Sequence, residues 1–223
     1  MAGMKRPRIC AVIVNSDLEA IRGAEPFVEL FEVRIDLVGE GWQELVKHLR
    51  KPWIACNRSA DEGGSWRGDE TRRIGELVEA AELGAGIVDI ELETGNLKEA
   101  IEQIDKRAEC LLSFHELKAT PPLDRMKEIV QRQLEAGADI CKVVATAQSF
   151  EDNLSVLQLI AEFPRTRIVS FAMGNLGLMS RVLCPLVGGD FTYASIEKGK
   201  ESAPGQIMAE DLRKLYKMVE NGK

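Results

Sequence analysis

The feature that most constrains the fold of this chain is a repeated alternation of short apolar runs with longer amphipathic segments. Each run has the length of a buried β-strand, and the segments between the runs repeat apolar residues at helical spacing, as Ile74, Leu77, Val78 and Ala81 do. The runs cover residues 9–14, 30–36, 53–56, 86–92, 110–114, 139–145, 167–172 and 190–195. The helices are expected near residues 17–24, 42–50, 74–84, 96–106, 121–137, 175–187 and 205–220, and Thr120 is expected to cap the helix over 121–137. One more helix is expected to begin at Ser149, which resembles a capping box with Asp152.

Eight strand–helix units in succession predict a parallel sheet with crossover helices. A chain of 223 residues without a composition break fits one small (β/α)8 TIM barrel, and we expect residues 1–223 to form a single domain. The rival is an open doubly wound sheet. That fold usually carries a glycine-rich turn after its first strand, and residues 14–17 contain no glycine.

Composition narrows the class of partner. Lys and Arg total 29 against 36 Asp and Glu, and the net charge of −7 argues against a nucleic-acid or anionic-membrane surface. No apolar run approaches the roughly 20 residues of a membrane span, and residues 1–8 lack the apolar core of a signal peptide. The five cysteines are odd in number and form no Cys-x-x-Cys pair, which is typical of a reduced, cytoplasmic protein.

The sixth apolar run, residues 139–145, carries a lysine in its middle, Lys142. Burial penalises an ammonium group, so the side chain must pair with an acid, reach water or lower its pKa. A lysine with a lowered pKa is a nucleophilic amine that forms Schiff bases with carbonyl compounds. A structural lysine that pairs with a carboxylate is the alternative, and the run by itself favours that alternative.

Ionisable side chains gather at the carboxyl ends of the expected strands, where TIM-barrel active sites lie. They predict a polar pocket at this end of the barrel, with Glu32, Arg34, Asp36, Arg58, Glu62, Asp89, Glu91, His115 and Lys142 near the strand ends and Arg181, Ser202 and Gln206 in the segments that follow strands seven and eight.

Within this group, His115 follows the strand next to that of Lys142. An imidazole beside an amine nucleophile is suited to moving protons near neutral pH, whereas the only other histidine, His48, lies on an expected surface helix. Arg58 and Arg181 are candidates for binding an anion, because a guanidinium can grip a carboxylate through two hydrogen bonds. The glycine-bearing stretches 62–64 and 173–177 lack phosphate-loop spacing and are expected to be tight turns.

Taken together and in order, these residues resemble the type I 3-dehydroquinate dehydratases over essentially the whole chain. The resemblance is carried by Phe31–Asp36, Asn57-Arg58 with Glu62-Gly63-Gly64, Asp89–Leu92, Ser113-Phe114-His115, Cys141–Val144, Ala172-Met173-Gly174 with Ser180-Arg181, and Ser202–Gln206. The departures are Val33 where the family often has an aromatic residue, Cys56 before Asn57-Arg58, and Glu116-Leu117 after the histidine. They leave every charged catalytic position in place and bear only on the shape of the pocket.

The resemblance implies a TIM-barrel hydro-lyase that converts 3-dehydroquinate to 3-dehydroshikimate, the third step of the shikimate pathway to aromatic amino acids. It implies a Schiff base on Lys142, His115 as general acid and base, and Glu62 as the residue that orients His115. The substrate would be held by Glu32, Arg34, Arg58, Arg181, Ser202 and Gln206. The family resemblance also implies that the reaction uses no metal or organic cofactor, and it suggests a homodimer.

Two alternatives remain at the level of the sequence. A class I aldolase would share the reactive lysine but would need a phosphate site, and the loop after the eighth run is not glycine-rich in that way. A non-catalytic barrel that binds a small acid or a protein would have an ordinary lysine pKa and would form no adduct with a ketone.

Overall fold

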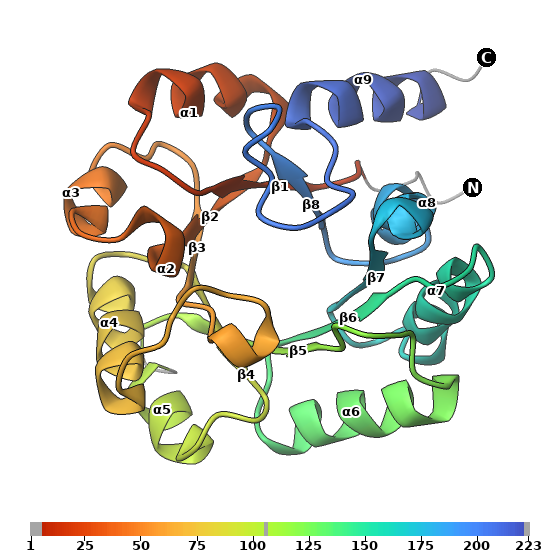
Figure 1. Cartoon of the computed structure of the whole chain (residues 1–223), viewed down its shortest axis with the longest axis horizontal. Helices are drawn as coiled ribbons and strands as arrows, with labels where there is room; N and C mark the ends of the chain where they lie inside the picture. The colour runs from red at the N-terminus through yellow and green to blue at the C-terminus, as the bar shows by residue number, and fades with distance from the viewer. Residues whose placement is uncertain (1–5, 105–106, 221–223) are drawn as a thin grey trace.

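A computed structural model describes residues 6–104 and 107–220 and confirms the eight-stranded parallel barrel (Figure 1). Every paired strand runs parallel to its neighbour, in the order β7-β6-β5-β4-β3-β2-β1-β8. The strands are β1 (Ile9–Ile13), β2 (Leu30–Arg34), β3 (Trp53–Cys56), β4 (Ile87–Glu91), β5 (Glu109–His115), β6 (Ile140–Thr146), β7 (Ile168–Met173) and β8 (Thr192–Ser195).

The pairing of the first strand with the last distinguishes a barrel from an open sheet. β1 runs beside β8 over four residue pairs, from Ile9 with Thr192 to Val12 with Ser195. This ladder excludes the doubly wound alternative. The remaining seam lies between β7 and β8, where the described residues form no ladder and the Asp190 N–H donates to the Ile168 carbonyl at 2.8 Å.

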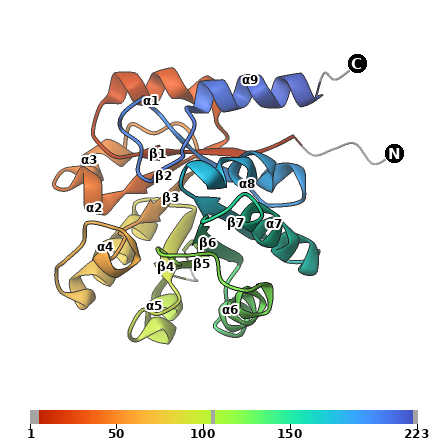
Figure 2. The ribbon, with the colours of Figure 1, turned by 45° about the vertical axis from the view of Figure 1, so that its right-hand side comes forward.

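Helices surround the ring of strands, as Figures 1 and 2 show from two directions. They are α1 (Leu18–Ala24), α2 (Ile35–Val38), α3 (Trp42–Val46), α4 (Glu70–Glu82), α5 (Leu97–Ile104), α6 (Leu123–Glu135), α7 (Asp152–Glu162), α8 (Leu178–Leu183) and α9 (Ala209–Glu220). Four short 3-10 turns join them, η1 (Glu25–Phe27), η2 (Ala60–Glu62), η3 (Asn175–Gly177) and η4 (Cys184–Leu186). In the described part of the chain, no helix combines the length and apolarity needed to cross a bilayer.

Strand alternation divides the apolar side chains into two cores, because successive residues of a strand point to opposite faces. The larger core lies between the outer face of the barrel and the helices, and it includes Phe31, Val33 and Leu77. The smaller core fills the barrel interior with side chains such as Leu30, Ile54, Ile87, Leu111 and Ile140. Two residues further along these strands, the interior positions become polar, so the apolar interior forms the floor of a pocket.

Several expected helix boundaries are wrong. The helix expected over 175–187 is divided into η3, α8 and η4. Gly177 lies against the backbone of Ala172 in β7, and Pro185 has no N–H to donate to a helical hydrogen bond. A side chain at Gly177 would place its Cβ 2.3 Å from the Ala172 carbonyl oxygen. The helix expected over 42–50 stops at Val46, and the helix expected from Gly205 begins at Ala209.

Of the residues expected to cap helices, some make the expected hydrogen bonds and others do not. Asp17 caps α1 by accepting hydrogen bonds from two amides of the first turn, as the sequence suggests. Thr120 does not cap α6, because its hydroxyl donates to the Thr146 carbonyl and the helix begins three residues later, at Leu123. At α7, Asp152 accepts from the amide of Ser149, which is half of the expected capping box. The last two residues of the helix expected over 96–106 lie outside the described residues.

Candidate active site

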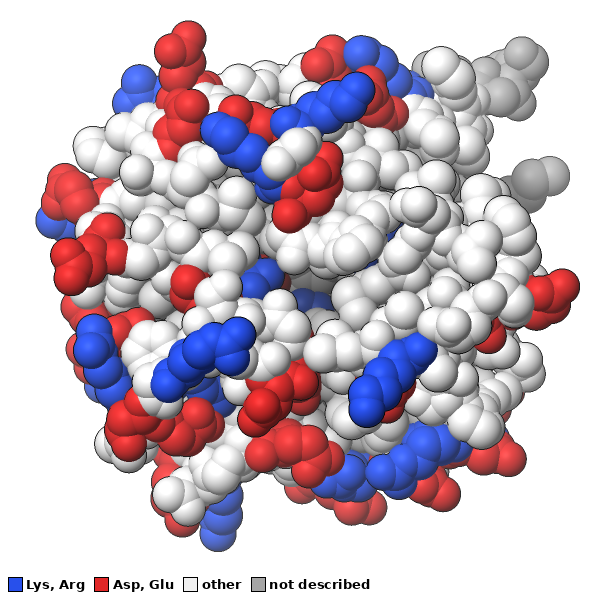
Figure 3. Space-filling view, viewed as in Figure 1, with Lys and Arg blue, Asp and Glu red and all other residues white. Residues whose placement is uncertain are grey.

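A cavity of about 290 Å³ opens at the carboxyl ends of the strands. Figure 3 shows a hollow in the middle of this face, with blue lysine or arginine atoms in its depth and uncharged atoms over much of its rim. The nine residues that the family resemblance implies for catalysis and binding all line this cavity: Glu32, Arg34, Arg58, Glu62, His115, Lys142, Arg181, Ser202 and Gln206. Asp36, Asp89 and Glu91, which were also expected in the pocket, are not among its lining residues.

Lys142 projects from β6 into the barrel and is almost fully buried. Its Nζ donates to Asp89 Oδ2 at 2.8 Å and to the Tyr193 hydroxyl at 3.1 Å, and it lies 3.7 Å from Glu32 Oε1. The amine also faces the ring of Tyr193, with 4.3 Å between Nζ and the ring centroid. The lysine is therefore held in one position by groups from β2, β4 and β8.

The pKa of Lys142 lies above its ordinary value. Burial by itself lowers it, but the carboxylates of Asp89 and Glu32 outweigh burial and favour the ammonium form. Of the three possibilities that the sequence left open, the structure shows pairing with acids, and the pKa of Lys142 is not lowered. The lysine rests as an ammonium ion, so its nitrogen must give up a proton before it can attack a ketone.

Asp89 contacts both Lys142 and a second buried cation, Arg58. Asp89 Oδ1 lies 2.6 Å from Arg58 NH2 and accepts a hydrogen bond from the Ser113 hydroxyl, also at 2.6 Å. Burial by itself raises the pKa of Asp89, but Arg58 and Lys142 reverse the effect and hold the pKa well below its usual range. Asp89 is consequently a carboxylate under all ordinary conditions and the permanent counter-ion of both cations.

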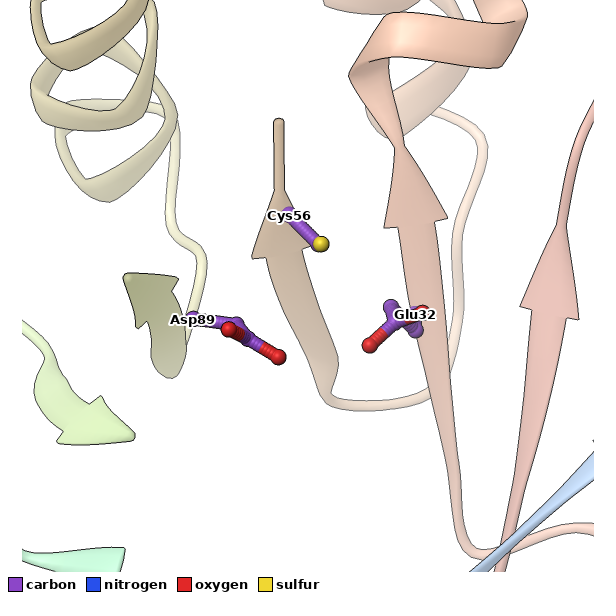
Figure 4. A group of neighbouring side chains, drawn as sticks. All are labelled: Glu32, Cys56 and Asp89. Carbon is purple, nitrogen blue, oxygen red and sulfur yellow. The ribbon is translucent and has the colours of Figure 1, made fainter. Parts of the chain in front are cut away.

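Glu32, Cys56 and Asp89 point toward one another from β2, β3 and β4 (Figure 4), with their ligand atoms within 4.8 Å of one another. Carboxylates and a thiol in such a group could hold a metal ion. Here the ammonium of Lys142 and the guanidinium of Arg58 already contact Asp89, and Arg58 also donates to Cys56 Sγ at 3.4 Å. Burial raises the pKa of the Cys56 thiol well above its ordinary value. We therefore interpret the two carboxylates as counter-ions of the two cations, with the Cys56 thiol as their neutral neighbour.

Arg34 is fixed by a carboxylate two residues away. Asp36, at the start of α2, accepts from Arg34 Nε at 2.8 Å and from NH2 at 2.7 Å, a bidentate pair. The same carboxylate accepts from the amides of Arg58 at 3.2 Å and Ser65 at 2.9 Å. Asp36 therefore joins one cavity arginine to both ends of the loop that carries Glu62.

His115, at the end of β5, forms a pair with Glu62 from the turn η2. His115 Nδ1 lies 2.7 Å from Glu62 Oε2, and the same oxygen accepts from the His115 amide at 3.1 Å. The other ring nitrogen, Nε2, is left for the cavity. The close packing of this loop explains one glycine of the sequence motif, because a Cβ on Gly64 would lie 2.0 Å from the Arg58 carbonyl oxygen.

The imidazole and the carboxyl are both displaced toward their neutral forms. Burial, Arg58 and Lys142 lower the pKa of His115 well below its ordinary value, and Asp89 opposes them only in part. Burial raises the pKa of Glu62 to about 8, although Arg58 acts in the opposite direction.

Arg181, on α8, is buried and has no counter-ion among the residues that the structure describes. Its Nε has no hydrogen-bond partner among the described residues, and NH2 makes one long contact of 3.4 Å with the Pro204 carbonyl. The guanidinium stacks 4.3 Å from the Phe171 ring centroid. Burial lowers its pKa to about 10, which leaves it charged at neutral pH. A buried cation with free donors facing a cavity is suited to binding an anion.

Ser202 and Gln206 close one side of the cavity. They bond to each other, with Gln206 Nε2 donating to Ser202 Oγ at 2.9 Å and the Ser202 amide donating to Gln206 Oε1 at 3.0 Å. Their loop touches the loop after β7, where the Gly174 amide donates to the Pro204 carbonyl at 3.2 Å. Gly205 adopts a left-handed conformation with φ of +81°, and a Cβ there would lie 2.5 Å from the Gly174 carbonyl oxygen.

One candidate functional residue, Tyr193, was not expected from the sequence, and Asp89 and Asp36 were expected in the pocket without a role. Asp89 and Asp36 belonged to the group of ionisable residues at the strand ends, but nothing in the sequence indicated which cations they would contact. Tyr193 was counted only as a strand residue. A register argument could have found it, because Tyr193 stands two residues after Phe191 on the interior face of β8.

The geometry brings three functions together in one cavity. Lys142 offers an amine that can become a nucleophile, the His115–Glu62 pair offers a proton acceptor and donor, and Arg181 offers a site for an anion. This combination suits a small carboxylic acid with a ketone and a removable proton next to it.

Comparison with known proteins gives a consistent result. The family model described as type I 3-dehydroquinase matches residues 9–223. A 3-dehydroquinate dehydratase of Dehalococcoides mccartyi is 42% identical over 217 residues, covering 97% of each chain. One of Methanocaldococcus jannaschii is 34% identical over 220 residues, covering 95% of this chain and 99% of the relative. The crystal structure of the Geobacillus kaustophilus enzyme superposes with a TM-score of 0.84 at 27% identity, covering 97% of this chain and 92% of that one.

Proposed function

The chain belongs to the type I 3-dehydroquinase family, and we propose that it removes water from 3-dehydroquinate through a Schiff base on Lys142, with His115 moving the protons. The observation that carries this proposal is the unpaired guanidinium of Arg181 in the same cavity as Lys142. The substrate is a carboxylate with a ketone, and it would supply the anion that Arg181 lacks. Family membership removes the aldolase and the non-catalytic barrel as alternatives.

The reaction begins when Lys142 attacks the ketone and, after loss of water, forms an iminium ion. The positive iminium withdraws electrons from the adjacent carbon and makes its C–H acidic. His115 Nε2 takes that proton and leaves an enamine. The protonated imidazole then gives the proton to the departing hydroxyl, which leaves as water, and hydrolysis of the remaining imine releases 3-dehydroshikimate and the free lysine. The lysine itself supplies the electron sink, so the proposed chemistry calls for no metal or organic cofactor.

Glu62 decides which form of His115 can act as a base. A neutral imidazole accepts a proton at Nε2 only when its single proton is on Nδ1, and a carboxylate at Glu62 holds that tautomer through the 2.7 Å contact. The carboxylate then stabilises the imidazolium that forms as the substrate loses its proton. This assignment gives Glu62 the role of orienting residue.

The remaining polar side chains would hold the substrate hydroxyl groups. Arg34 and Arg58 are fixed by Asp36 and Asp89, so little conformational freedom is lost when they bind the substrate. Glu32 Oε1 is buried without a hydrogen-bond partner among the described residues, and it can accept from a hydroxyl. Ser202 and Gln206 belong to a loop that would close over the bound substrate and exclude water.

Reductive trapping tests the proposal directly. Borohydride added during turnover should reduce the imine and leave a stable adduct on Lys142, which peptide mass spectrometry can locate. His115→Ala should still form this adduct and lose turnover. An adduct on a different lysine, or no adduct, would contradict the assignment of Lys142, and retained turnover in His115→Ala would remove His115 from its role.

We also propose that the enzyme serves aromatic amino-acid biosynthesis in the cytoplasm as a homodimer. Burial of all five cysteine thiols is compatible with a reducing compartment. A contact surface is available near α7 and α8, where Phe150, Leu154 and Met179 are exposed and Figure 3 shows mostly uncharged atoms over α8. Sedimentation at micromolar concentration should give twice the mass of the chain, and a monomer would exclude the dimer.

A further inference from the structure

Tyr193 contacts the reactive nitrogen of Lys142, yet the reaction described above gives it no part. Its hydroxyl oxygen accepts a hydrogen bond from Nζ at 3.1 Å, and its side chain lines the cavity. The residue lies on β8, whereas His115 lies on β5, so the two proton-carrying side chains approach from different strands. The position of Tyr193 calls for a role at the nitrogen and its immediate surroundings.

The hydroxyl has a proton to give. Within the described part of the chain, Tyr193 Oη receives the N–H of Lys142 and has no acceptor for its own O–H. Burial and the neighbouring carboxylate of Glu32 raise the pKa of the phenol well above its ordinary value, so the group remains neutral. A neutral phenol that accepts on one side and has a free O–H on the other can pass a proton between two partners.

Imine formation needs such a transfer. The resting lysine is an ammonium ion, and the balanced step is ammonium plus ketone giving iminium plus water. Two of the three protons on Nζ must leave with the ketone oxygen, while the third stays on the iminium nitrogen. Asp89 accepts a hydrogen bond from Nζ at 2.8 Å and can keep the third proton engaged throughout.

We propose that the Tyr193 hydroxyl relays protons from Lys142 Nζ to the ketone oxygen of the substrate during formation of the Schiff base, and in the reverse direction during its hydrolysis. As the nitrogen bonds to the carbonyl carbon, the C=O π pair moves to oxygen. Oη gives its proton to that oxygen and takes one from Nζ. A second relay of the same kind accompanies the breaking of the C–O bond, which releases water and leaves the iminium.

The relay divides the proton transfers between two residues and rests on the Schiff-base mechanism proposed above. Tyr193 serves the steps in which the C–N bond is made and broken, and His115 serves the elimination. This division explains how a His115→Ala variant could still accumulate an imine. The phenol is never required to stay ionised, because each relay returns a proton to Oη as it removes one.

The chain offers a matched pair of substitutions, because it contains only two tyrosines. Tyr193→Phe removes the hydroxyl and keeps the ring, which packs against Phe171 and Phe191 at centroid distances of 6.0 and 5.4 Å. Tyr216→Phe removes the other buried tyrosine hydroxyl, which donates to the Val182 carbonyl at 2.9 Å outside the cavity. The second variant controls for the loss of a buried hydroxyl as such.

The test measures imine formation without elimination. In a His115→Ala background, rapid mixing with 3-dehydroquinate and quenching in borohydride gives the rate at which the Lys142 adduct appears. Exchange of the ketone oxygen with ¹⁸O-labelled water reports the same step without a reductant. We expect Tyr193→Phe to slow both about tenfold or more and to change the solvent deuterium isotope effect on adduct formation. We expect Tyr216→Phe to leave both rates unchanged.

Three results would overturn the relay. Adduct formation and oxygen exchange in Tyr193→Phe at the rates of the His115→Ala background would show that the hydroxyl carries no proton in this step. Slower rates with an unchanged solvent isotope effect would show that it only positions Nζ. Absence of any adduct in the His115→Ala background, with Tyr193 intact, would overturn the Schiff-base mechanism itself and is therefore distinguishable from the other two.

Discussion

The two sides of the cavity each contain a buried arginine, but only one of the two arginines is paired with carboxylates. On the side built by β2, β3 and β4, Arg58 lies 2.6 Å from Asp89 and 3.1 Å from Glu91, and it donates to Ser113 at 2.7 Å. On the side built by β7 and α8, Arg181 is equally buried but has an aromatic ring and one long carbonyl contact as its neighbours. The guanidinium of Arg58 is part of a network of ion pairs and hydrogen bonds, whereas Nε of Arg181 has no hydrogen-bond partner among the described residues.

This difference between Arg58 and Arg181 assigns the two arginines different contributions to stability and to substrate binding. A cation held by several partners is rigid, so any N–H that remains free can bind a substrate without moving. A buried cation without a counter-ion destabilises the empty protein and recovers that free energy when an anion arrives. We infer that Arg181 contributes chiefly to substrate affinity, while Arg58 contributes to the fold of the site as well as to binding.

The largest expected effect comes from removing the paired arginine. Arg58→Met should lower the free energy of unfolding by about 3–5 kcal/mol, because Asp89 and Glu91 each lose a partner in a buried position. Urea unfolding followed by circular dichroism measures this change. A loss below 1 kcal/mol would mean that the network does not depend on Arg58.

The matched change on the other side is Arg181→Met. We expect kcat/KM for 3-dehydroquinate to fall about 100-fold, roughly 2.7 kcal/mol, through a higher KM. The free energy of unfolding should stay the same or rise, because no counter-ion of Arg181 is left behind. A variant that loses stability as strongly as Arg58→Met would remove the contrast between the two sides.

The pH dependence of activity tests the pair that lies between the two sides. Burial raises the pKa of Glu62 to about 8, and only its carboxylate form holds the tautomer of His115 that can act as a base. As pH falls toward 6, Glu62 gains a proton and kcat/KM should fall, with an apparent pKa well above 4.5. Glu62→Gln should move this limb to lower pH and reduce the rate. An unshifted limb would exclude Glu62 from the titration.

The same shift predicts a sign for stability. The folded state binds a proton at Glu62 up to about pH 8, whereas the unfolded carboxyl releases it near 4.5. The contribution of Glu62 is therefore fully present below pH 4.5 and is lost as pH rises toward 8. The difference in unfolding free energy between the native chain and Glu62→Gln should decrease over this interval, and an increase would contradict the shift.

A smaller effect is expected at Asp36, which joins Arg34 to the loop on the paired side. Asp36→Asn keeps the shape and removes the charge, so each hydrogen bond to it weakens. We expect a loss of about 1 kcal/mol in stability and a several-fold rise in KM, measured by urea unfolding and steady-state kinetics. Asp211→Asn, on the exposed face of α9, is the control and should change neither quantity. Equal effects at both positions would mean that Asp36 does not organise the site.

The sequence was sufficient for the architecture and for the site residues that the family resemblance implies. Eight apolar runs separated by amphipathic segments predict parallel strands covered by crossover helices, and the absence of glycine in residues 14–17 favours the barrel over an open sheet. Nine of the twelve polar residues expected at one end of the strands line the cavity, whereas Asp36, Asp89 and Glu91 do not, and Tyr193 was not expected there. Their individual roles in binding and catalysis remain predictions for the experiments above.

What the sequence could not supply was the pairing of charges across the barrel. Lys142 lies 53 residues from Asp89, and the sequence gives no distance between their side chains. That contact decides between the possibilities that the sequence left open, because it raises the pKa of Lys142. The spacing of apolar residues also did not predict that the helix after β7 is divided into η3, α8 and η4. That division follows from the missing N–H of Pro185 and from the close approach of Gly177 to the backbone of β7, and neither affects the spacing of apolar residues.

The pairing of β1 with β8 has a consequence for folding during synthesis on the ribosome. Lys142 and its carboxylate neighbours are synthesised well before Tyr193, and the barrel can close only after both β1 and β8 have been made. An unfinished chain therefore lacks the β8 wall that buries Lys142. Only a completed chain holds the fully enclosed amine, so a truncated product that ends before residue 192 should be an inactive, aggregation-prone polypeptide.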